Sequence, residues 1–165
     1  MDKYAQIIYL PFYQFNMRKW LLNFVFTLLS AANAIAQNTT ESENVRKTCL
    51  QYIEGFYEGD SLKIISCMRP SLYKFGYWQN KTSGIYEADG FMTYRHAIDY
   101  AKNMYNKKKK AKEGSPKEVV VYDVMNKIAY AKITAWWGVD YLLLSKNGDS
   151  WQIEQVLWEG PLEKK

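Results

Sequence analysis

The sequence has little of what metal cages and disulfide scaffolds need. Its 165 residues include one histidine and two cysteines, and structural zinc sites use four Cys or His ligands. A zinc cage built by this chain alone is therefore nearly excluded, and we expect no cofactor. Four prolines and 24% charged residues also argue against a disordered or collagen-like chain. A hydrophobic content of 48% is enough for one sizeable core in a soluble domain.

The positive charge is concentrated in one place. The formal net charge is +5, and five of the 22 basic residues lie in the six-residue run from Lys107 to Lys112. Lysines favour the C-terminal end of a helix, so we interpret this run as a solvated helix end or loop. No helix-turn-helix, zinc-finger or RNA-binding motif accompanies it, and we do not expect a nucleic-acid partner.

An apolar stretch near the start is too short to cross a bilayer comfortably. It runs from Trp20 to Leu29, whereas a span needs roughly 20 residues. Arg18 and Lys19 precede it, and small residues ending in Ala34-Ile35-Ala36 follow it. This order of basic, apolar and small residues is typical of a secretory signal. An anchoring or buried N-terminal helix is the alternative.

The signal defines the expected domain organisation. We predict initiation at Met17, cleavage after Ala36, and a division into an upstream extension with signal peptide (1–36) and one domain (37–165). The mature chain would be secreted or periplasmic, with no stable membrane span.

An oxidising compartment changes the meaning of the two cysteines. Cys49 and Cys67 lie on opposite sides of the Gly59-Asp60 break. If two antiparallel helices meet there, a disulfide between them would stabilise the fold by roughly 3 kcal/mol. Two buried free thiols are an equally good interpretation.

Apolar spacings of three and four predict three helices. The first carries Val45 to Tyr57 and ends at Gly59, and the second, Ser61 to Met68, is capped by Asp60. A loose hairpin with turn residues 80–84 follows. The third helix is expected to be capped by Asp89. Its apolar face would comprise Phe91, Tyr94, Ile98, Ala101 and Tyr105.

After Pro116 the apolar pattern changes to alternation, which predicts strands separated by short turns. Short links require an antiparallel meander. Both faces of the second strand are substantially apolar, so helices should cover one face and a partner subunit part of the other. The expected strands are Glu118 to Met125, Lys127 to Trp137, Val139 to Lys146 and Trp151 to Trp158.

Three segments carry a resemblance to a known family: Tyr52 to Asp60 (YIEGFYEGD), Ala131 to Leu144 (AKITAWWGVDYLLL) and Gly148 to Trp158 (GDSWQIEQVLW). Together they resemble the lumazine-binding family of secreted bacterial proteins, within the nuclear transport factor two-like (cystatin-like) superfamily. The resemblance implies an α+β cone with three N-terminal helices packed on a curved, mainly antiparallel sheet. It also implies a cone-shaped pocket and a homodimer.

An aromatic cup with a few polar groups is the expected construction of a small-molecule site. Trp137, Tyr141 and Trp158 are candidate walls, and Asp140 and Gln155 are candidate polar contacts. We therefore predict non-covalent binding of a small hydrophobic or aromatic molecule. The full set of predicted ligand-binding residues is Tyr52, Phe56, Tyr57, Trp137, Asp140, Tyr141, Gln155 and Trp158.

Two other functions stay open. A pocket enzyme of the isomerase or dehydratase type would use Tyr57 as oxyanion donor and Asp140 as base. A structural dimerisation module would use Trp136, Thr134 and Tyr130, on the sheet face opposite Trp137. His96 and Asp99, three residues apart, are interpreted as a surface pair.

Overall fold

The computed structural model describes residues 39–162, apart from residue 109. The chain divides into two units at residue 37, and the described residues belong to the second, Asn38–Lys165. The predicted signal peptide, its start at Met17 and its cleavage after Ala36 lie outside the described residues.

Two consecutive helices open the described part of the chain. The first covers residues 39–58 and ends at Gly59, whose φ of +73° is the left-handed conformation that favours glycine. The second, α2 (Ser61–Cys67), is capped by Asp60, whose Oδ1 accepts hydrogen bonds from the Leu62 and Lys63 amides. Both predicted helix boundaries at this break are confirmed.

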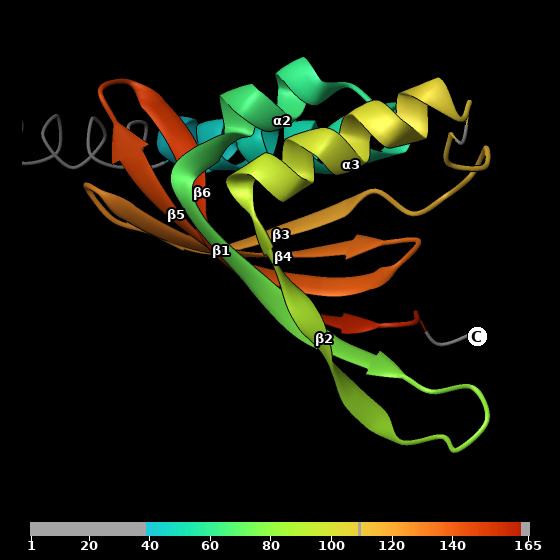
Figure 1. The fold of residues 1–165 in the computed structure, drawn as a ribbon. Coiled ribbons are helices and arrows are strands. Elements are labelled where there is room, and N and C mark those ends of the chain that lie inside the picture. Colours follow the sequence, from blue (N-terminus) through green and yellow to red (C-terminus); the bar gives the residue numbers. More distant parts are fainter. Residues whose placement is uncertain (1–38, 109, 163–165) are drawn as a thin grey trace, which may run out of the picture. The chain divides into compact units, whose positions relative to one another are not determined.

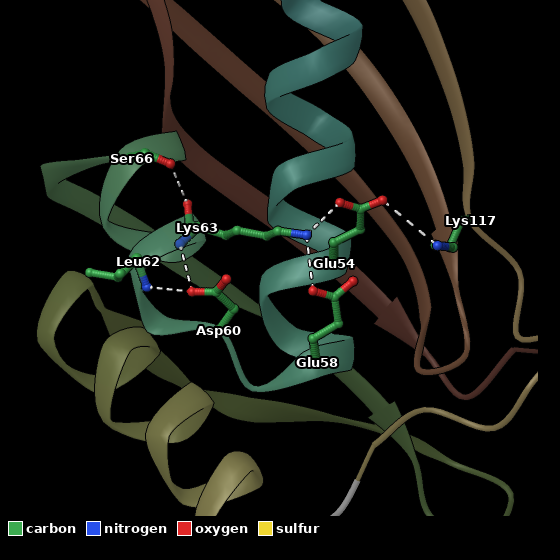
Figure 2. A network of polar contacts seen from close by, with 7 residues as sticks. All are labelled: Glu54, Glu58, Asp60, Leu62, Lys63, Ser66 and Lys117. Atoms are coloured by element: carbon green, nitrogen blue, oxygen red, sulfur yellow. Dashed lines mark hydrogen bonds and ion pairs between the residues drawn. The ribbon is translucent and has the colours of Figure 1, made fainter.

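Charged side chains hold α2 against the first helix. Lys63 Nζ lies 2.8 Å from Glu54 Oε2 and 2.9 Å from Glu58 Oε2, and Lys117 reaches the other oxygen of Glu54 at 3.7 Å (Figure 2). Half-exposed pairs of this kind contribute little individually. Their effect is to set the orientation of α2 at the helix break.

The third helix begins later than the sequence predicts. α3 (Tyr94–Asn106) is capped by Thr93, whose Oγ1 accepts a hydrogen bond from the His96 amide at 3.3 Å. Asp89 is therefore not the cap, and Phe91 is 59% exposed in a strand, not on the helix face. The physical reason is pairing: residues before Thr93 form backbone hydrogen bonds with a neighbouring strand, and this long-range contact overrides the local cap signal.

Six strands form one sheet in the order β2-β1-β6-β5-β4-β3. The last four are the predicted antiparallel meander, which is confirmed. β1 pairs with β2 as an antiparallel hairpin but with β6 in parallel, so the sheet is mixed. The strands are β1 (Met68–Gln79), β2 (Tyr86–Thr93), β3 (Glu118–Val124), β4 (Ile128–Ala135), β5 (Gly138–Asn147) and β6 (Ser150–Gly160).

The placement of the helices along the chain differs from the expectation of three N-terminal helices. β1 and β2 separate α2 from α3, so two helices precede the sheet and one follows its first hairpin. In space, however, the helices lie on the same side of the sheet (Figure 1). The inward-facing side chains of β4 are buried beneath this layer: Ala129, Ala131, Ile133 and Ala135.

The opposite side of the sheet is exposed and rich in apolar side chains. Alternation along the strands puts these residues outward, since neighbouring residues point to opposite faces. Large exposed members include Tyr73, Tyr77, Val120, Tyr122, Ile128, Tyr130, Tyr141, Leu143 and Leu157. We call this side of the sheet the outer face.

A β-bulge at Glu154 changes the alternation within β6. Leu144 pairs with Ile153, but Leu143 pairs with Gln155, so Glu154 is the extra residue. As a result Ile153 and Val156 are both buried on the helix side. The bulge also directs Trp158 to that side.

None of the helices in the described part of the chain combines the length and the apolar character needed to cross a bilayer.

Candidate functional site

A cavity of about 230 Å³ opens on the helix side of the sheet, where its β1, β2 and β6 end meets the first helix and α3. Four of its nine lining residues are tryptophans, so the wall is largely aromatic. We call it the tryptophan pocket. Its lining residues are Phe56, Lys74, Trp78, Asp89, Met92, Tyr100, Trp136, Trp137 and Trp158.

A buried polar cluster lies next to this pocket and is centred on Asp140, whose side chain is fully buried. The Trp137 indole Nε1–H donates to Asp140 Oδ1 at 2.6 Å. The Tyr52 hydroxyl and the Lys74 ammonium both donate to Oδ2, at 2.5 and 2.9 Å. Lys74 also donates to the Tyr52 hydroxyl oxygen at 2.8 Å. Both carboxylate oxygens are thus occupied by protein donors.

This cluster stabilises a charge pair that water barely reaches. Lys74 is 7% exposed, and burying an ammonium is costly unless a carboxylate and further hydrogen bonds compensate. Burial raises the pKa of Tyr52 well above its ordinary range, and the adjacent Asp140 charge raises it further. Tyr52 therefore remains a neutral hydroxyl that donates to Asp140.

Edge-to-face ring contacts shape the aromatic wall. The centroid of the Phe56 ring lies 5.6 Å from that of Tyr100 and 5.9 Å from that of Trp137, and the ring planes are nearly perpendicular in both pairs. Trp78 and Trp158 approach each other at 6.1 Å on the sheet side. Such pairs limit ring rotation and add about 0.5–1.5 kcal/mol each beyond burial. The aromatic wall thus consists of rings that contact one another.

Gly76 makes room for one tryptophan of the wall. It pairs with Trp158 across the parallel β1–β6 ladder. A Cβ at position 76 would lie 2.1 Å from the Trp158 carbonyl oxygen and 2.5 Å from its Cδ1. Any larger residue would push Trp158 away, so the glycine is needed for this side chain position.

Tyr57 is placed beside the pocket but not in its lining. Its hydroxyl donates to the Pro116 carbonyl at 2.5 Å and accepts from the Trp136 amide at 2.9 Å. Its ring contacts Trp137 at 5.7 Å. Tyr57 thus ties the turn that carries both tryptophans to the segment before β3.

The structure brings together most of the predicted site residues. Phe56, Trp137 and Trp158 line the pocket, while Tyr52, Tyr57 and Asp140 support its wall. Tyr141 and Gln155 are instead exposed on the outer face. Tyr141 follows the inward Asp140 in β5, and Gln155 precedes the inward Val156 in β6, so both point to the other side. Tyr141 stacks on Tyr130 there, with ring centroids 6.1 Å apart.

The most informative residue that the sequence analysis overlooked is Lys74. The sequence gives no clear signal for it, because the alternate row of the same strand, Tyr73, Phe75 and Tyr77, is the more apolar one. Only the structure shows that Leu72, Lys74 and Gly76 are the buried row. The other lining residues not predicted as ligand contacts are Trp78, Asp89, Met92, Tyr100 and Trp136.

Trp136 and Trp137 were expected on opposite faces, and this expectation is wrong. β4 ends at Ala135, so both residues lie in the turn before β5, where strand alternation no longer applies. Their rings contact each other at 5.8 Å and both line the pocket.

The remaining sequence candidates lie away from the pocket lining. His96 and Asp99 are exposed, as expected of a surface pair. The ion-pair partner of Asp99 is Arg95, with Arg95 Nε 3.9 Å from Asp99 Oδ2. Cys49 and Cys67 are buried and free in this structure. Burial raises the pKa of Cys49 to about 12 and raises that of Cys67 as well. Such thiols are poor nucleophiles.

Comparison with known proteins supports the family and the fold. The model of the family described as "Putative lumazine-binding" matches residues 40–159. An NTF2-like protein of unknown function from Shewanella baltica OS155 superimposes with a TM-score of 0.54 at 14% identity, covering 73% of this chain and 93% of its own. No curated protein matches the chain significantly.

Two further solved structures are similar to this chain. An NTF2-like protein of unknown function from Shewanella oneidensis MR-1 has a TM-score of 0.51 at 14% identity, covering 73% of this chain and 99% of its own. A domain with a cystatin-like fold from Nostoc punctiforme PCC 73102 has a TM-score of 0.50 at 13% identity, covering 76% and 80%. At these identities the likeness establishes the NTF2-like α+β fold alone.

Proposed function

The chain belongs to the Putative lumazine-binding family, and from this premise we propose that it is an exported protein that holds a small hydrophobic or aromatic molecule in the tryptophan pocket. The observation that carries the proposal is the pocket itself: four indoles and a phenyl ring around one buried ammonium. Apolar walls with a few placed polar groups are typical of small-molecule sites.

The size of the pocket favours a compact ligand. Its volume of about 230 Å³ lies just below the range of about 300–1,000 Å³ that is common for drug-sized ligands. Planar one- or two-ring molecules suit this space, because they can stack on or against the indole faces. Residues expected to contact such a ligand directly are Phe56, Trp78, Trp136, Trp137 and Trp158.

The contacts of the two catalytic candidates favour binding over catalysis. A general base needs a lone pair directed at the substrate, but Asp140 accepts from Trp137, Tyr52 and Lys74. An oxyanion donor needs a hydroxyl hydrogen, and that of Tyr57 is directed to the Pro116 carbonyl. In this arrangement both groups serve the wall of the pocket.

Export and dimer formation are part of the same proposal. The basic, apolar and small residues before Gln37 support secretion to the periplasm or outside the cell. The outer face supports a homodimer, because large apolar side chains exposed on neighbouring strands mark interaction sites. The dimer would leave the pocket accessible, since the two lie on opposite sides of the sheet.

A ligand panel tests the binding proposal. Pterins, flavins, steroids and fatty acids are added in excess to the purified chain, and the unfolding midpoint is followed by tryptophan fluorescence. A bound class raises the midpoint by mass action. The variant Met92→Trp fills the pocket from β2 and should abolish the rise. Met125→Trp is the matched control, since Met125 is exposed and lines a different hollow.

The two variants separate the outcomes. A midpoint rise in the wild type and Met125→Trp, but not in Met92→Trp, assigns the ligand to the tryptophan pocket. Equal rises in all three place binding elsewhere and contradict the proposal. If no class raises the midpoint, the dimerisation module without ligand becomes the better account.

A further inference from the structure

The ammonium of Lys74 has more hydrogen-bonding capacity than the protein uses. A lysine Nζ carries three N–H donors. Tyr52 Oη and Asp140 Oδ2 accept two of them at 2.8 and 2.9 Å, and no third acceptor contacts Nζ among the described residues. Lys74 lines the tryptophan pocket, and its Nζ lies 5.4 Å from the Trp158 ring centroid.

We propose that the ligand presents an uncharged hydrogen-bond acceptor, a carbonyl oxygen or an aromatic ring nitrogen, to the third N–H of Lys74. The inference rests on the proposed function and deepens it by naming the chemistry at one edge of the ligand. The Lys74 side chain is 9% exposed. A hydrogen bond to a charged donor in so dry a position is stronger than one between neutral groups.

Charge explains why the acceptor is neutral. Asp140 already compensates Lys74 at 2.9 Å, so the buried pair carries no net charge. A carboxylate on the ligand would lose its own hydration and would be repelled by the Asp140 carboxylate behind the lysine. A cationic group at the same position would be repelled by Lys74, and the Asp89 carboxylate, which also lines the pocket, would attract it to the β2 side instead. A carbonyl or ring nitrogen accepts the hydrogen bond without either cost.

Asp140 and Tyr52 keep the donor directed into the pocket. Both acceptors belong to groups that are fully buried, one on β5 and one on the first helix. Because they hold Nζ from the protein side, its remaining hydrogen is directed away from them. The ligand acceptor completes a hydrogen-bond set that the fold has prepared on the other two positions.

A series of two-ring probes of similar size tests the inference. Isothermal calorimetry compares 2-quinolone, which offers a neutral carbonyl, with naphthalene, 2-naphthoate and 2-naphthylmethylammonium. We expect 2-quinolone to bind at least about tenfold more tightly than naphthalene or 2-naphthoate, as one charge-assisted hydrogen bond predicts. 2-Naphthylmethylammonium reports separately on the Asp89 carboxylate that also lines the pocket.

A variant pair links the preference to Lys74. The double variant Lys74→Met/Asp140→Asn removes both charges, so no uncompensated ion is left buried. It should bind 2-quinolone and naphthalene with affinities within about threefold of each other. Lys132→Met is the matched control. Lys132 lies on the outer face of β4, and its loss should leave the tenfold preference unchanged.

Each outcome bears on one proposal or on both. If the wild type binds naphthalene as tightly as 2-quinolone, the role of Lys74 is wrong while the aromatic pocket stands. Preference for 2-naphthoate overturns the neutral acceptor in the same way. If none of the four probes binds while a class of the ligand panel does, the two-ring acceptor is wrong and the proposed function stands. If neither set binds, both are contradicted. The wild-type comparison is decisive even if the double variant fails to fold.

Discussion

Trp137 donates its indole N–H to a carboxylate oxygen of Asp140, three residues further along the chain, at 2.6 Å. This contact links the turn between β4 and β5 to the buried cluster beneath the pocket. A wall residue and a core charge therefore depend on each other. Changes to the cluster should alter both stability and the shape of the pocket.

The first prediction concerns the charge pair. Asp140→Asn leaves the Lys74 ammonium buried without a carboxylate, which should lower the free energy of unfolding by about 3–5 kcal/mol. The double variant Lys74→Met/Asp140→Asn should lose less than Asp140→Asn alone, because no lone charge remains. Urea denaturation of the wild type, Asp140→Asn, Lys74→Met and the double variant measures the coupling between the two residues. Additive losses would show that the pair does not interact as described.

The second prediction concerns Gly76. In Gly76→Ala, the new Cβ would collide with the Trp158 carbonyl and ring, so we expect a loss of about 1–3 kcal/mol in the free energy of unfolding and weaker ligand binding. Gly90→Ala on neighbouring β2 is the control, because a Cβ at position 90 would meet no atom within 4 Å. Similar losses in the two variants would mean that strand propensity, not contact with Trp158, determines the effect.

The third prediction concerns alkaline pH. Burial raises the pKa of Cys49 from its ordinary 9.0 to about 12. The unfolded chain therefore loses this proton at lower pH than the folded chain does. Stability from Cys49 is complete below about pH 9 and falls by about 1.4 kcal/mol per pH unit as pH rises towards the folded value. Cys49→Ala should show a decline shallower by that amount in denaturation series between about pH 9 and pH 11.

The same cysteines test the open question of a disulfide. The wild type should show two free thiols that react with an alkylating reagent only after denaturation, because both are buried. The mass of the unreduced, alkylated chain reports this directly. A mass two hydrogens lower, with no alkylation after denaturation, would show a Cys49–Cys67 bond and would also abolish the alkaline slope.

The fourth prediction concerns the homodimer. Leu143→Glu places a charge in the outer face, where Leu143 is 48% exposed, and should shift the protein towards monomer in sedimentation velocity. Leu62→Glu is the control, since Leu62 is 73% exposed on α2. A wild type that is monomeric at all concentrations, or equal dissociation by both variants, would argue against a dimer through this face.

Local patterns were sufficient for the parts of the fold that depend on near neighbours. The Gly59-Asp60 break, α2 and the β3–β6 meander follow from apolar spacing and from turn residues only a few positions apart. Phe56 and Trp158 could be predicted for the same reason, since each lies on the inward side of its own element. Trp137 was predicted from the alternation of a strand that in fact ends two residues earlier, at Ala135. The start of α3 could not be predicted, because Asp89 offers a cap that strand pairing overrides.

The sequence by itself thus determined the element types, the helix break and the presence of an aromatic inward face. Only the tertiary structure decided that β1 runs parallel to β6, and this pairing places Lys74 beside Tyr52 and Asp140, which are 22 and 66 residues away along the chain. No local periodicity encodes such a meeting. It results from which strands share backbone hydrogen bonds, and that choice depends on burial summed over the whole domain.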